Sequence, residues 1–338
     1  MVTRRTLSVI RHFTRWAAFA VVLLAGSSVA FGQETATILG TVKDASGAAV
    51  AGANVTARKT DTQQSRAATT DSDGSYRIPG LFVGNYEVRV EHEGFQAAVR
   101  TGLVLTVDLQ AVTNFTLQIG SVSQTVEVTG EAPLVDTTTS SLGGLVDSKR
   151  MEDLPLNGRN YIDLSLMQVG VNEQKNGVHQ VGYVGDYVVS NGATVRSNNY
   201  LIDGANMTNA WGVSSASVTN STLGVDGIRE YKVVTNAFKA EYGMTAGSQM
   251  LMVSKGGTNS FHGDVFEYLR NSALDAKNPF DTLVSSGGKR LPEFQRNNFG
   301  ASLGGPIRKN KIFFNAVYEG LRQSRALRKL PMFSRRIA

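Results

Sequence analysis

Residues that alternate between apolar and polar side chains make up much of the chain after residue 33. Within Ala53–Lys59 and Tyr86–His92, every second residue is small or apolar and its neighbours are polar or charged. A period of two predicts strands that bury one face and expose the other. Further strands are predicted between turns at Thr37–Lys43, Ser75–Ile78 and Val112–Leu117. Short strands at this spacing predict a small β-sandwich over residues 33–120.

The later part of the chain combines a helix-prone stretch, Ser148–Leu154, with short apolar strands such as Tyr231–Val234. After Gly257, three longer strands are predicted at Phe261–Arg270, Asn297–Gly304 and Lys311–Glu319. In the first of these, the residues Phe261, Asp264, Phe266 and Tyr268 do not alternate cleanly. Periodicity alone therefore does not define that strand.

The N-terminus has the layout of a secretory signal. Basic residues precede the apolar run Trp16–Ala25, and the small residues Gly26–Ala30 follow it. These are the three regions of a signal peptide, which we place at residues 1–32. A membrane anchor is the alternative, but the apolar run has about half the ~20 residues that a spanning helix needs. We therefore expect export from the cytoplasm.

The net charge of +6 comes from the two ends of the chain. Four arginines precede residue 16 and six basic residues follow Gly320, with no acidic residue in either segment. The body between them is mildly acidic, so the high pI does not indicate nucleic-acid binding. The 35 glycines suit β-structure with many turns, and the absence of cysteine excludes disulfides and thiolate zinc sites. We predict no cofactor and no metal.

Neither the histidines nor any short motif predicts catalysis. The four histidines are scattered, and no Gly-x-Ser-x-Gly elbow occurs. Lys289 follows two glycines, but Arg290 stands where a phosphate-binding loop needs Ser or Thr. Asp71-x-Asp73-Gly74 resembles the start of a calcium loop, but its glycine spacing favours a tight turn. We predict that the protein is not an enzyme.

Several motifs, in order along the chain, resemble a single family. Four segments resemble the carboxypeptidase-regulatory-like, or transthyretin-like, sandwich: Gly40–Asp44, Val50–Ala53, Gly74–Tyr76 and Gly84–Tyr86. Four more follow at Leu154–Tyr161 (LPLNGRNY), Asn198–Asn206 (NNYLIDGAN), Asp226–Gly243 and Asn297–Ile307. Together they resemble the TonB-dependent outer-membrane receptors of the Oar-like kind. The chain then corresponds to an N-terminal fragment of such a receptor, without most of its barrel.

The resemblance implies a mainly β fold. It comprises the transthyretin-like β-sandwich, an α+β plug domain over residues 136–257 and the first strands of a truncated transmembrane β-barrel over residues 258–320. The basic residues 321–338 have no barrel pattern and depart from the family. The resemblance also implies a place in the cell outer membrane, with the sandwich in the periplasm. There the receptor takes up a small-molecule or oligosaccharide ligand by gated conformational change, driven by the TonB energy-coupling protein.

Two candidate sites follow from the resemblance. In the linker 121–135, the residues Thr125, Val126, Glu127, Val128 and Thr129 look like a TonB box, the segment that TonB captures as an added strand. The alternative is that they form the last strand of the sandwich or the first of the plug. In the loop Gly204–Ser221, Trp211 is a candidate ligand contact, or else it packs against the barrel wall.

The predicted strands are too few to close a barrel. Transporters of this class close ~22 strands around a plugged lumen, whereas three are predicted here. An open sheet cannot lie in hydrocarbon, because its edges leave backbone groups unpaired. We expect a truncated gene product, with a periplasmic plug-plus-module protein as the alternative. A surface or adhesion protein of the same architecture is the second functional hypothesis.

Overall fold

The computed structural model describes most of the chain from residue 35 onward. The described residues are 35–120, 125–129, 141–153, 159, 161–173, 188–208, 223–236, 242–243, 246–276, 291 and 293–325. The predicted signal peptide, residues 154–158 of the LPLNGRNY motif, Trp211 and the tail from residue 326 lie outside them. Among the described residues, no helix is long and apolar enough to cross a membrane.

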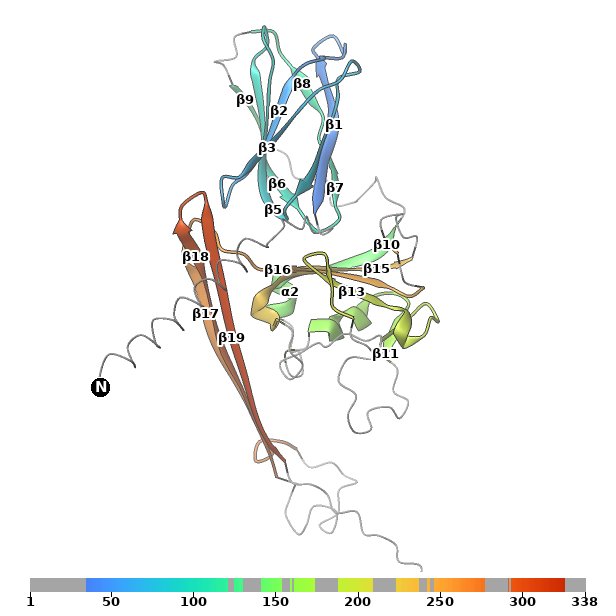
Figure 1. Ribbon diagram of the computed structural model, residues 1–338, viewed down its shortest axis with the longest axis vertical. Helices are drawn as coiled ribbons and strands as arrows, with labels where there is room; N and C mark the ends of the chain where they lie inside the picture. The colour runs from blue at the N-terminus through green and yellow to red at the C-terminus, as the bar shows by residue number, and fades with distance from the viewer. Residues whose placement is uncertain are drawn as a thin grey trace, which may run out of the picture. The chain divides into compact units, whose positions relative to one another are not determined.

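The N-terminal part is a sandwich of two sheets (Figure 1). One sheet has the order β4 (Ser75–Leu81), β1 (Ala36–Asp44) and β7 (Gln110–Val112), with β8 (Phe115–Leu117) also on β1. The other has the order β3 (Ser65–Thr69), β2 (Asn54–Lys59), β5 (Gly84–Glu91), β6 (Ala97–Leu105) and β9 (Thr125–Thr129). The alternation predicted the inner faces correctly, because Val55, Ala57, Tyr86, Val88 and Val90 all lie in the core.

The predicted strand Val112–Leu117 was wrong as a single element. The segment forms two short strands, β7 and β8, which pair in parallel with successive parts of β1. Between them the chain bends at Thr113, whose carbonyl lies directly against Gly40 of β1. A Cβ on Gly40 would overlap this carbonyl, so the glycine permits the close approach.

Residues Asp71–Gly74 form the tight turn that leads into β4. The Asp71 Oδ1 accepts hydrogen bonds from the amides of Asp73, at 3.0 Å, and of Ser75, at 2.8 Å. Gly74 has a φ of +71°, in the left-handed region that glycine adopts without strain. The carboxylate of Asp71 thus holds its own turn together, as the glycine spacing indicated.

The middle part contains a five-stranded sheet in the order β10 (Leu142–Asp147), β15 (Ile228–Asn236), β16 (Gln249–Ser254), β13 (Asn199–Ile202) and β14 (Ala205–Asn206). The strands β11 (Val171–Glu173) and β12 (Val188–Ser190) form a separate pair. Helix α2 (Ser148–Asp153) and the 3₁₀ turns η1 (Tyr161–Met167), η2 (Val195–Ser197) and η3 (Val225–Gly227) connect these strands. The Tyr231 hydroxyl donates to the Tyr161 carbonyl at 2.8 Å, which ties η1 to the sheet inside a buried cluster.

The last part is an antiparallel sheet of β17 (His262–Asn271), β18 (Phe294–Arg308) and β19 (Ile312–Arg325). Strand β19 continues five residues past the predicted boundary at residue 320. Cross-strand neighbours share a face of the sheet. The row Val265, Ala301 and Tyr318 carries exposed apolar side chains, with Val265 86% and Tyr318 65% exposed. The adjacent row Phe266, Gly300 and Glu319 therefore lies on the opposite face.

Candidate functional site

The LPLNGRNY motif places an arginine in an uncommon backbone conformation. Arg159 has a φ of +55°, in the left-handed region that non-glycine residues seldom occupy. Such a conformation costs free energy and persists only where the surroundings hold it. The contacts of the Arg159 side chain are therefore expected to hold this conformation.

The Arg159 guanidinium lies between two buried carboxylates. Its Nη2 is 2.7 Å from the Oδ2 of Asp226, which belongs to η3 beside the middle sheet. Its Nε is 3.1 Å from the Oε1 of Glu319, in β19. The exposed fractions of the three side chains are only 11%, 5% and 7%. Charges removed from water are stable only when they are paired, so the three groups depend on one another.

Two aromatic rings complete this cluster. The Arg159 guanidinium carbon lies 3.8 Å from the centroid of the Phe266 ring and 5.5 Å from that of Tyr268, both in β17. A guanidinium at this distance from an aromatic face is attracted by the ring quadrupole. Gly300 in β18 leaves room for the Phe266 ring, since a Cβ there would lie 2.6 Å from its ring carbons. The five residues Arg159, Asp226, Phe266, Tyr268 and Glu319 are called the arginine cluster below.

The cluster is packed closely at its acidic end. A Cβ on Gly224, just before η3, would overlap the Oε2 of Glu319. Burial raises the pKa of Asp226 above its ordinary value, and the positive charge of Arg159 acts in the opposite direction. One cation thus stabilises two carboxylates from separate parts of the chain.

A second pair of contacts joins the sandwich to strand β15. The amide of Val107, just after β6, donates a 2.5 Å hydrogen bond to the Oε1 of Glu230. The neighbouring Asp108 accepts a 3.0 Å ion pair from the Nζ of Lys232. Burial raises the pKa of Glu230, and the hydrogen bond from Val107 opposes this. The loop after β6 is therefore tied to β15 by polar contacts.

The candidate TonB box, Thr125–Thr129, is strand β9. It pairs in parallel with the first half of β6, from Ala97 opposite Thr125 to Thr101 opposite Thr129. Strand β9 is the last in the five-stranded sheet, so its other edge has no neighbouring strand within that sheet. The pairing corresponds to the alternative in which this segment is the last strand of the sandwich.

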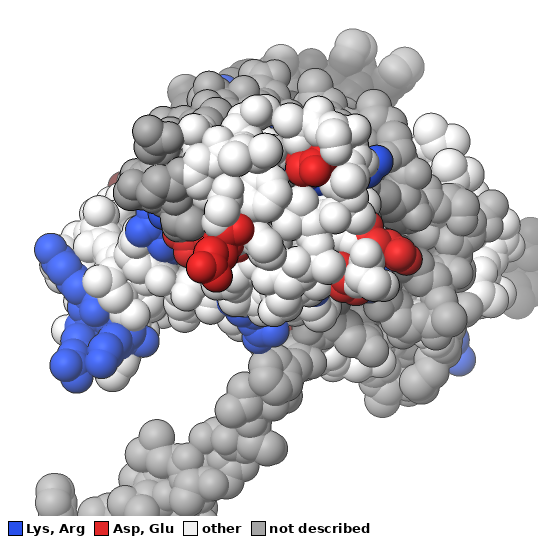
Figure 2. All heavy atoms as spheres, turned by 90° about the horizontal axis from the view of Figure 1, so that it is seen from above, with Lys and Arg blue, Asp and Glu red and all other residues white. Residues whose placement is uncertain are grey.

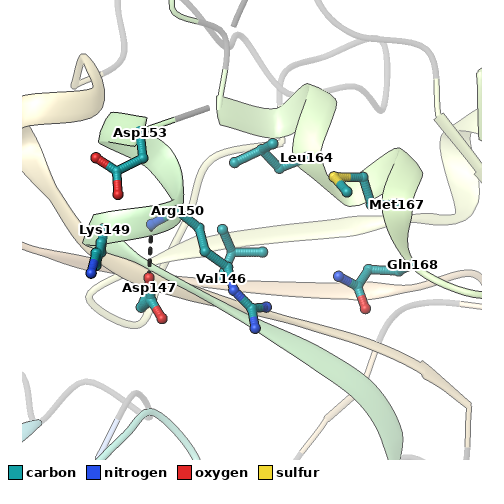
Figure 3. A pocket seen from close by; sticks show the side chains of 8 residues that line it. All are labelled: Val146, Asp147, Lys149, Arg150, Asp153, Leu164, Met167 and Gln168. Atoms are coloured by element: carbon teal, nitrogen blue, oxygen red, sulfur yellow. Dashed lines mark hydrogen bonds between the residues drawn. The ribbon is translucent and has the colours of Figure 1, made fainter. Parts of the chain in front are cut away.

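A cavity of about 550 Å³ opens between helix α2 and the turn η1 (Figure 3). Val146, Leu164 and Met167 supply apolar walls, and the charged side chains at its rim come from α2 and the residue before it. Asp147 is used locally, because its Oδ1 accepts a 2.8 Å hydrogen bond from the Arg150 amide at the start of α2. The volume is within the ~300–1,000 Å³ range of small-molecule pockets.

Charged side chains are spread thinly over the face shown in Figure 2. Acidic and basic residues form small separate groups there, with uncharged surface between them. This visible face of the described residues therefore presents both signs of charge, unlike the basic stripe of a nucleic-acid-binding surface.

Comparisons with known proteins agree with this architecture. Residues 37–118 match the model of the carboxypeptidase regulatory-like domain, and residues 253–331 match that of an outer membrane beta barrel domain. The chain is 30% identical over 314 residues to the TonB-dependent transporter Oar of Myxococcus xanthus. That match covers 88% of this chain and 28% of the relative. The predicted resemblance to Oar-like TonB-dependent receptors is confirmed.

Several solved structures share part of the fold at low sequence identity. The siderophore receptor PirA of Acinetobacter baumannii is 20% identical, with 56% of this chain and 26% of that chain covered and a TM-score of 0.39. A variant of the ferric enterobactin receptor PfeA of Pseudomonas aeruginosa is 14% identical, with 54% and 24% covered and a TM-score of 0.38. A catechol 1,2-dioxygenase of Acinetobacter is 13% identical, with 30% and 60% covered and a TM-score of 0.23. All three TM-scores are below 0.5.

The receptor resemblance found only part of the candidate site. Arg159 belongs to the LPLNGRNY motif, but the sequence does not predict that Asp226, Glu319 or Phe266 contacts it. One sequence feature points to the missing part of the site: in the strand Phe261–Arg270, aromatic residues interrupt the alternation of apolar and polar side chains. Trp211, the candidate ligand contact, lies outside the described residues.

Proposed function

We propose that the chain is the N-terminal portion of a TonB-dependent outer-membrane receptor that binds a nutrient ligand and admits it by gated movement of the plug. The observation that carries this proposal is the arginine cluster. It joins Arg159 and Asp226 of the plug to Glu319 of a barrel strand through ion pairs rather than through apolar packing. Buried charges hold a position specifically, yet water can solvate each of them again once the plug shifts.

Energy coupling needs a segment that a partner can capture, and β9 is the segment that we propose for it. Its sequence TVEVT is β-competent, and it occupies the edge of a sheet, where strand exchange is possible. TonB would be the partner, and the pull on β9 would pass to the plug that follows it in sequence. The receptor would lie in the outer membrane with its sandwich in the periplasm. A small molecule or an oligosaccharide would be the ligand.

Binding to TonB tests this function directly. Residues Thr125–Thr129 are replaced by alternating glycine and serine in the complete chain, and binding to the periplasmic part of the source organism's TonB protein is measured by surface plasmon resonance. The matched control replaces Ser65–Thr69, the opposite edge strand of the same sheet, in the same way. Loss of binding only in the first variant is expected. Equal binding by the two variants would contradict the proposal and favour the adhesion hypothesis.

A further inference from the structure

The pairing between β9 and β6 makes the proposed TonB box an edge strand of the sandwich. Five residues of β9 run parallel to Ala97–Thr101. The backbone groups that β9 presents to β6 in this ladder are not free for another strand at the same time. Resting on the proposed function, we propose that β6 holds the TonB box in a closed state, and that TonB captures it by replacing β6 as its neighbour.

The sheet is built so that β9 can leave without dismantling the fold. Strand β6 keeps its antiparallel partner β5 on the other side, with Val90 opposite Ala98 and Tyr86 opposite Leu103. The sandwich core is formed by residues from strands β1, β2 and β4 to β8 together with their loops. These strands therefore retain their own packing when the edge strand is exchanged.

The pairing is also of a kind that can be exchanged. Parallel ladders are slightly less stable for each residue than antiparallel ones. Here the ladder spans five residues, and β9 has a single neighbouring strand in the sheet. A partner that offers a strand edge supplies equivalent hydrogen bonds, so the exchange replaces one ladder by another.

The partner must offer a strand edge that competes with Ala97–Thr101 of β6, a stretch that carries one charged residue, Arg100. The first three residues of this stretch, Ala97, Ala98 and Val99, are all less than 10% exposed, and two of them have the small side chain of alanine. The complementary partner surface is accordingly an open sheet edge, which is the chemistry that we assign to TonB. The sandwich thus acts as a regulatory competitor for its own receptor's coupling strand.

A disulfide across the ladder tests the closed state. The native chain contains no cysteine, so an introduced pair has no competing thiol. Val99 lies opposite Glu127 in the register, so Val99→Cys with Glu127→Cys can be oxidised across the ladder. The control is Val99→Cys with Val126→Cys. It is displaced by one residue, and adjacent strand residues point to opposite faces.

The expected result has two parts. The in-register pair forms a disulfide, the displaced pair does not, and oxidation lowers TonB binding of the in-register variant at least tenfold, with recovery in dithiothreitol. Failure of the in-register pair to crosslink would overturn the inference, and so would equal TonB binding by the oxidised and reduced forms. Either of these outcomes leaves the proposed function intact. The glycine-serine replacement of Thr125–Thr129 tests that function independently.

Discussion

Replacing Arg159 by methionine would leave two buried carboxylates without their cation. Asp226 and Glu319 are 5% and 7% exposed, so water does not replace the guanidinium while the plug stays in place. Removing one partner of a buried ion pair costs about 3–5 kcal/mol. At about 1.4 kcal/mol for each factor of ten, local opening becomes roughly 100- to 4,000-fold more frequent.

Native-state hydrogen exchange of the purified chain measures this opening. Protection should fall in η3, in the adjoining part of β15 and in the section of β19 around Glu319, because the cluster joins these elements. The control Arg58→Met removes an arginine whose partner is Glu87, at a site where Arg58 is 45% exposed. An exposed pair of this kind contributes about 0–1 kcal/mol, so protection should change little.

The dependence on pH gives a second test of the same cluster. Burial already raises the pKa of Asp226 in the folded chain, and loss of Arg159 raises it further. The ionised carboxylate therefore destabilises the variant more as pH rises through that pKa. The loss of hydrogen-exchange protection, relative to the unsubstituted chain, should be larger at pH 8 than at pH 5. Adding Asp226→Asn and Glu319→Gln to Arg159→Met should restore most of the protection. Unchanged protection in the single variant, or no recovery in the triple variant, would refute the reasoning.

Three further predictions concern single contacts. Burial lowers the pKa of Lys59 to about 8, below its unfolded value of 10.5, so the chain should gain thermal stability as pH rises from 8 to 10, and Lys59→Met should abolish this gain. Gly224→Ala should lower exchange protection in β19 because its Cβ overlaps the Glu319 carboxylate, whereas Gly243→Ala, which meets no atom within 4 Å, should not. Asp147→Ala removes the capping bond to the third residue of α2 and should cost about 1 kcal/mol, seen as faster exchange of that helix's amides. A persisting pH-dependent gain in Lys59→Met, or unchanged exchange in Gly224→Ala or Asp147→Ala, would contradict the contact assigned to that residue.

The sandwich could be predicted wherever burial leaves a period-two signal. Strands β2 and β5 bury every second residue, so the alternation specified both their existence and their inner faces. Strand β3 (Ser65–Thr69) lies at a sheet edge with almost all of its residues exposed, so no alternation marks it. Strand β6 is interrupted near Gly102, with φ +77°, where its register against β5 shifts. A bulge inserts one residue and moves the later side chains to the other face, which hides the strand from a periodic search.

The arginine cluster could not be assembled from the sequence for a different reason. Arg159 and Asp226 are 67 residues apart, and Glu319 lies farther along in a strand of another sheet. Periodicity and motif spacing describe neighbours along one element, whereas this contact depends on how three elements pack. The motif supplied the cation, and only the packing identifies the groups that neutralise it.

The irregular strand at Phe261–Arg270 is visible in the sequence pattern and also takes part in the packing of the arginine cluster. Phe266 and Tyr268 lie on the same face of β17, and both rings lie near the Arg159 guanidinium, with centroids 3.8 Å and 5.5 Å from its central carbon. An aromatic face attracts this cation without adding a third buried carboxylate to the two already present. The broken alternation therefore has a physical cause, because the aromatic residues of β17 lie against the charge of Arg159. The same irregularity in a relative's first barrel strand, together with an arginine in the LPLNGRNY motif, would predict the same cluster there.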